Sequence, residues 1–83
     1  MKEFIFTGNI ENNINRFKKF IGNPKEIERL EILCQTGEEV TLAQIAEAVL
    51  AISKTVQENT YVNFDNVIDE KLNNDEMIVK VKL

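Results

Sequence analysis

The pattern of apolar residues is most regular between Thr41 and Glu58. Apolar side chains recur there every three or four residues, the spacing of one helix face: Leu42, Ile45, Val49, Ile52 and Val56. Small and branched neighbours widen this face to roughly half of the helix circumference, more than the apolar stripe of an ordinary surface helix: Ala46, Ala48 and Leu50. We therefore predict a central helix over residues 41–58, on which the other elements pack.

Two further elements are predicted at the start of the chain. Residues 2–7 alternate in polarity and place Phe4 and Phe6 on one side, which is typical of a short strand. Residues 10–21 carry a narrow apolar stripe at helical spacing, and Gly22 follows where a helix often ends. The pattern thus predicts a strand followed by a helix.

Residues 24–35 are predicted to form a second helix. Asn23 and Pro24 are a favoured N-cap and first helical residue. Ile27, Leu30 and Cys34 then fit an inner stripe, and Gly37 provides the stop.

The pattern changes to strands after residue 57. Residues 60–64 are rich in strand formers, residues 65–66 favour a turn, and residues 67–72 indicate a weaker strand. Residues 76–83 alternate most cleanly, with four apolar side chains on the inner side: Met77, Val79, Val81 and Leu83. We expect the first and last strands to be neighbours.

These elements predict an α+β fold in one compact domain, residues 1–83. The order is β-α-α-α-β-β, with the middle strand divisible into two pieces. Three helices, with the 41–58 helix central, are expected on one face of a small, largely antiparallel sheet.

Composition supports a small folded domain. The 83 residues are 43% hydrophobic and 29% charged, and they include neither a membrane-length apolar run nor a signal-peptide pattern. The single cysteine also favours the cytoplasm over a secreted location. The abundance of Lys, Asn and Ile is typical of a low-GC bacterium or its phages.

Catalytic chemistry is disfavoured by the residue types present. The chain has no histidine and a single serine, Ser53, which removes the common triads and dyads. Cys34 falls within the predicted apolar stripe and is interpreted as a core residue. A calcium loop over residues 65–76 has three fitting acids, but it lacks the central glycine and has Val67 where a ligand belongs. We predict no enzyme activity, no cofactor and no metal site.

The segment TLAQIAEAVLAISKTV resembles the core of a bacterial helix-turn-helix. Seven residues have counterparts in that pattern: Thr41, Gln44, Ile45, Ala46, Ile52, Ser53 and Val56. The predicted strands that follow are similar to those of winged-helix proteins, and the resemblance implies a DNA-binding regulator. The turn glycine is replaced by the helix-forming sequence of residues 49–51, so we expect one unbroken helix instead.

Charge points to another class of partner. The net charge is −4, which disfavours nucleic acid and anionic membranes. We predict a non-enzymatic protein-interaction domain, a small regulator or inhibitor that a phage or mobile element could encode. An acidic inhibitor that mimics nucleic-acid phosphates belongs to the same class. The predicted partner-binding residues are Asp65, Asp69, Glu70, Asp75 and Glu76.

Three alternatives stay open. These acids also fit an ordinary solvated loop. The basic residues Arg16, Lys18, Lys19 and Lys25 form a second candidate surface. Self-association as a homodimer is also compatible with the apolar face of the 41–58 helix.

Overall fold

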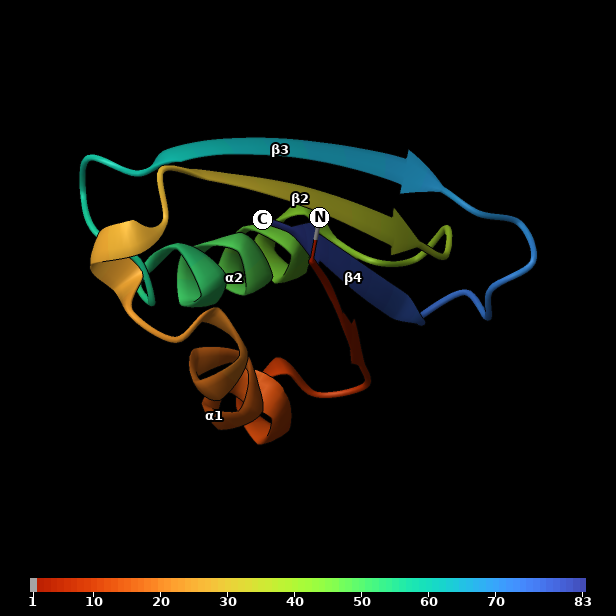
Figure 1. Cartoon of the computed structure of the whole chain (residues 1–83). Coiled ribbons are helices and arrows are strands. Elements are labelled where there is room, and N and C mark those ends of the chain that lie inside the picture. Colours follow the sequence, from red (N-terminus) through yellow and green to blue (C-terminus); the bar gives the residue numbers. More distant parts are fainter. Residues whose placement is uncertain (1) are drawn as a thin grey trace.

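The computed structural model describes residues 2–83, in which a four-stranded sheet carries both helices on one face (Figure 1). No helix of this part of the chain is long and apolar enough to cross a membrane. In chain order the elements are β1 (Glu3–Thr7), α1 (Ile10–Ile21), the 3₁₀ turn η1 (Pro24–Glu26), β2 (Arg29–Thr36), α2 (Leu42–Ser53), β3 (Tyr61–Ile68) and β4 (Met77–Lys82). The predicted α+β class is confirmed.

The sheet is mixed, with the strand order β1-β4-β2-β3. β4 is antiparallel to both of its neighbours, β1 and β2. The predicted pairing of the first and last strands is therefore confirmed. β2 and β3 are parallel and are connected through α2, because parallel neighbours need a long crossover. The expectation of a largely antiparallel sheet is correct only for the β1-β4-β2 part.

The predicted helix over residues 24–35 is wrong. Only η1 forms there, with the Asn23 side chain accepting a hydrogen bond from the Lys25 backbone N–H at 3.1 Å. The residues after it form β2, in which every second side chain is buried: Leu30, Ile32, Cys34 and Thr36. The order is thus β-α-β-α-β-β, with two α-helices instead of three.

Two boundaries also differ from the prediction. α2 ends at Ser53, and the chain turns before residue 58. Residues 65–66 form no turn but lie inside β3, where the Asn66 amide donates to the Cys34 carbonyl and the Thr36 hydroxyl at 3.1 and 3.2 Å. These bonds to β2 hold a turn-favouring residue in an extended conformation.

α1 and β1 are where the pattern placed them. The Asn9 side chain caps α1 by accepting from the Glu11 N–H, and Gly22 ends the helix with a positive φ of 68°. Phe4 and Phe6 both face α1 and contact Phe17, with ring centroids 5.4 and 5.2 Å from it. This aromatic contact closes the β1 end of the core.

The core is one cluster between the two helices and the sheet. α2 contributes Ile45, Ala48 and Ile52, which are buried, and Val49, which is partly buried. Val56, in the turn after α2, is also partly buried. β4 contributes Val79 and Val81, as predicted. The remaining fully or nearly fully buried apolar residues are Phe6, Phe17, Ile21, Leu30, Ile32 and Cys34.

Candidate functional site

The five predicted partner-binding acids lie in two places. Asp65 is on β3, on the sheet face that the helices leave open. The other four lie in the connection between β3 and β4: Asp69, Glu70, Asp75 and Glu76. The structure therefore does not gather the predicted residues into one site.

The β3–β4 connection uses two of its acids for its own conformation. The Asp69 carboxylate accepts from the Lys71 N–H at 3.0 Å, and the Glu76 carboxylate accepts from the Asn73 N–H at 3.1 Å. Such side-chain caps are common in turns. The connection also packs on the segment before α2, because Gly37 donates to the Glu76 carbonyl at 2.8 Å.

These contacts bear on the calcium-loop alternative. Asp65 is separated from the connection because it lies within a paired strand, and the carboxylates of Asp69 and Glu76 already accept backbone N–H groups. In the described residues 2–83, no three His, Cys, Asp or Glu residues come together as a metal-ligating group.

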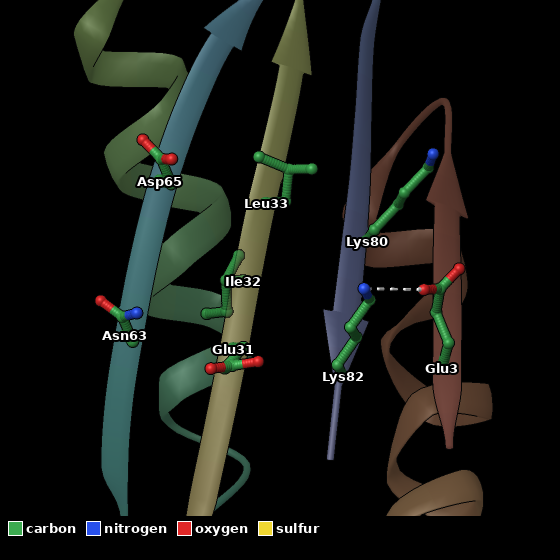
Figure 2. A pocket seen from close by; sticks show the side chains of 8 residues that line it. All are labelled: Glu3, Glu31, Ile32, Leu33, Asn63, Asp65, Lys80 and Lys82. Carbon is green, nitrogen blue, oxygen red and sulfur yellow. Dashed lines mark ion pairs between the residues drawn. The ribbon is translucent and has the colours of Figure 1, made fainter. Parts of the chain in front are cut away.

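The open face of the sheet has a shallow hollow of about 270 Å³, shown in Figure 2 with the helices behind the strands. Its charged side chains stand in register across the strands. Lys82 on β4 lies between Glu3 on β1 and Glu31 on β2, and its ammonium group is 4.0 Å from the Glu3 carboxylate. Two residues further along β2, Leu33 lies between Lys80 on β4 and Asp65 on β3.

This hollow has the properties of a solvated sheet face. Positive and negative groups alternate, and the ion pairs are exposed, so each contributes little to stability. Arg29 continues the pattern, because it pairs with Glu31 at 3.3 Å and stacks on the Tyr61 ring at 5.4 Å. An antiparallel or mixed sheet with one covered face normally shows such a polar opposite face.

Cys34 is a core residue, as predicted, although it lies on a strand instead of a helix. Its side chain is fully buried under the helices. Burial raises the pKa of the Cys34 thiol from 9.0 to about 11, because the thiolate would lose its hydration. A thiol in this state is a poor nucleophile at neutral pH.

A second surface, which the sequence-based site prediction missed, is apolar. Six of the seven exposed large hydrophobic residues in the described chain belong to α2 and β3; Ile5 is the seventh. Leu42 is 82% exposed and Phe64 is 45% exposed, although both would be expected in a core. Four of the six lie on the helix side of the sheet: Leu42, Leu50, Phe64 and Ile68. Tyr61 and Val67 alternate with them along β3 and point to the open face.

Part of this surface is a groove between α2 and β3, with a volume of about 380 Å³. We name it the α2–β3 groove; its lining residues are Leu42, Ile45, Ala46, Val49, Leu50 and Phe64. None of these side chains is polar. The wide apolar arc of residues 41–58 was the signal for it, since the sheet covers only part of that arc.

The groove borders an edge of the sheet. β3 pairs with β2 on one side, and no strand of residues 2–83 pairs with its other side. Unpaired strand edges are where other chains add by main-chain hydrogen bonding. An apolar groove and an open edge therefore lie side by side.

Comparison with known proteins assigns no relative to the chain. A scan against protein-family models finds no match, and a search of curated proteins finds no significant match.

The architecture implied by the helix-turn-helix resemblance is not present. α2 continues without a break through Leu50 and Ala51, as the missing turn glycine indicated. The residues after it form turns and then β3, which pairs with β2 and not with β4. The segment is one helix packed on a sheet.

Proposed function

We propose that this chain is a non-enzymatic protein-interaction domain that binds another polypeptide, as a small regulator or inhibitor. The observation that carries the proposal is the α2–β3 groove, whose lining is entirely apolar and includes the exposed side chains of Leu42, Leu50 and Phe64. Contiguous apolar surface bordered by polar residues is characteristic of protein–protein contact. The hollow on the open face is lined instead mainly by charged and polar side chains.

The acids add a preference for a basic partner. Asp69 and Glu70 directly follow β3, and Asp75 and Glu76 precede β4. These four acids form a negative region beyond the end of β3, and the net charge of −4 has the same sign. Such a region steers a basic partner and speeds association more than it prolongs the complex.

DNA binding by residues 41–56 is the weaker alternative. α2 exposes Glu47 and the apolar residues Leu42 and Leu50, and its first cation is Lys54 at the C-terminal end. Phosphate contacts need several cations on one surface. We expect no salt-sensitive binding to duplex DNA, and electrophoretic mobility shifts with a random duplex pool would measure it.

The proposal is tested by affinity capture from the source organism, with nuclease-treated and untreated lysates. The tagged chain should retain one protein partner in both lysates, and Leu50→Gln should weaken its capture at least about fivefold. Ile5→Gln is the matched control, because Ile5 is similarly exposed, 50% against 57%, on the opposite edge strand. Recovery of nucleic acid alone, or of no specific component, contradicts the proposal.

The role of the acids is measured separately with the captured partner. Replacing Asp69, Glu70, Asp75 and Glu76 by Asn or Gln should slow association at low salt about tenfold and change the dissociation rate much less. An unchanged association rate would remove these four residues from the proposed surface and direct attention to Arg16, Lys18, Lys19 and Lys25.

A further inference from the structure

The direction of the backbone groups in β3 defines what its open edge can bind. The N–H groups of Tyr61 and Asp69 both donate to the β2 side, to the Glu28 and Thr36 carbonyls at 2.9 Å. Since these directions alternate along a strand, residues 62, 64, 66 and 68 present their N–H and C=O groups to the open edge. The same residues have their side chains on the helix-covered face, toward α2.

One of these four N–H groups is already occupied. The Asp65 carboxylate accepts a hydrogen bond from the Asn66 N–H at 2.9 Å. Asp65 thus covers the middle of the edge with a negative charge, a device that discourages unspecific strand addition. A strand that adds along the whole edge must draw this carboxylate away.

The charge of the edge argues against a second copy of this chain as the occupant. From residue 57 to residue 70 the chain carries four acids and no cation: Glu58, Asp65, Asp69 and Glu70. Two β3 edges would bring these like charges together, which is destabilising between adjacent strands. A basic partner strand would meet the opposite charge along the same length.

We infer that β3 accepts an extended segment of a partner protein as a fifth strand, with a Lys or Arg of that segment facing Asp65. This inference rests on the proposed function and specifies its surface. Side chains of an added strand alternate between the two faces. Those on the helix side enter the α2–β3 groove beside Phe64 and Leu50, and those on the other side lie next to Asp65.

In this arrangement, the Lys or Arg of the partner segment also helps the main-chain hydrogen bonds between β3 and the added strand to form. An ammonium or guanidinium group beside Asp65 competes with the Asn66 N–H for its carboxylate. The released N–H can then donate to the added strand. The partner segment is therefore apolar at alternate positions and basic between them, and the groove selects its apolar side chains while Asp65 selects its charge.

The test uses four acetylated, amidated eight-residue peptides and the full chain labelled with ¹⁵N. In the lysine peptide, valine alternates with lysine and threonine. In the glutamate peptide, glutamate replaces lysine. The other two are lysine peptides N-methylated on one or the other set of alternate amides, so that one edge of each cannot donate.

We expect the lysine peptide to produce saturable shifts and slower amide exchange at Val62, Phe64 and Asn66. The glutamate peptide should bind about tenfold more weakly. At least one of the two possible N-methylation patterns should abolish binding, since a ladder uses one edge of the peptide. In the Asp65→Asn variant, the dissociation constant of the glutamate peptide should exceed that of the lysine peptide by only about twofold. The Asp75→Asn variant should keep the tenfold difference.

Leu50→Gln should weaken both peptides several-fold, and Ile5→Gln should weaken neither. Shifts confined to residues 69–76 or to the open face overturn the inference while leaving a polypeptide-binding role in place. The absence of saturable binding by the lysine peptide also overturns it, and the capture experiment separately decides whether a polypeptide partner exists.

Discussion

The β1–α1 side and the α2–β3 side of the molecule both pack a helix on the same sheet, but only the first contact is closed. Phe4, Phe6, Phe17 and Phe20 meet at the β1–α1 contact with centroid separations of 4.8–6.3 Å. The fifth phenylalanine, Phe64, lies on the other side and is 45% exposed beside the α2–β3 groove. Four of the five phenylalanine rings thus close the β1–α1 contact, whereas the α2–β3 contact stays open.

The first side buries its large apolar side chains, whereas the second leaves Leu42, Leu50 and Phe64 exposed. The distinction arises because α1 presents large rings to the sheet, whereas α2 presents Ile45, Ala48 and Ile52 and directs Leu42 and Leu50 to solvent.

The largest expected effect on stability comes from removing a phenylalanine ring from the closed contact. Phe17→Ala should lower the free energy of unfolding by about 3–5 kcal/mol, because Phe17 is fully buried and its removal leaves a cavity. Phe64→Ala is the matched control and should cost less than about 1 kcal/mol. Urea unfolding followed by circular dichroism measures both, and equal losses would contradict the comparison.

An effect of intermediate size is expected at high pH. Burial raises the pKa of the Cys34 thiol to about 11 from 9.0, so the folded state holds this proton when the unfolded state has lost it. The contribution of Cys34 to stability is therefore complete below pH 9 and decreases as the pH rises toward 11, by about 2 kcal/mol at pH 11.

Unfolding measured from pH 8 to pH 11 tests this expectation, with Cys34→Ala as the reference for the other titrating groups. The wild-type curve should fall more steeply than that of the variant. Parallel curves would show that the thiol ionises at a similar pH in the folded and unfolded states, and the core around Cys34 would then be more hydrated than described.

The sequence predicted the closed side well because its signals agree with one another. The alternation at Phe4 and Phe6, the stripe of residues 10–21 and the alternation of residues 77–83 all match the observed elements. Within β2 the signals conflict. Ile27, Leu30 and Cys34 fit a helical spacing after the Asn23-Pro24 start, yet Leu30, Ile32 and Cys34 also alternate, and pairing with β3 and β4 decides for the strand.

The open side could be predicted only in part. The apolar arc of residues 41–58 was wider than one sheet contact requires, but the sequence does not say which part of the arc the sheet covers. That depends on the parallel pairing of β2 with β3, a long-range contact. The acids were identified from charge alone, and the structure separates Asp65 from the other four because residues 65–66 continue β3 instead of turning.

The smallest expected effect is on the open side. The double variant Leu42→Gln, Leu50→Gln should change the free energy of unfolding by less than about 1 kcal/mol, since both side chains are already exposed. Thermal unfolding measures this change. A loss above about 2 kcal/mol would mean that these residues support the fold and are not held for a partner.

Photo-crosslinking in cells of the source organism tests most directly whether the α2–β3 groove contacts a partner polypeptide. A benzophenone amino acid is placed at position 64 or, as the control, at position 5, which is similarly exposed on the opposite edge strand. We expect one discrete protein adduct from position 64, lost in the Leu50→Gln background, and none from position 5. Adducts of equal yield from both positions, or from position 5 alone, would contradict the claim.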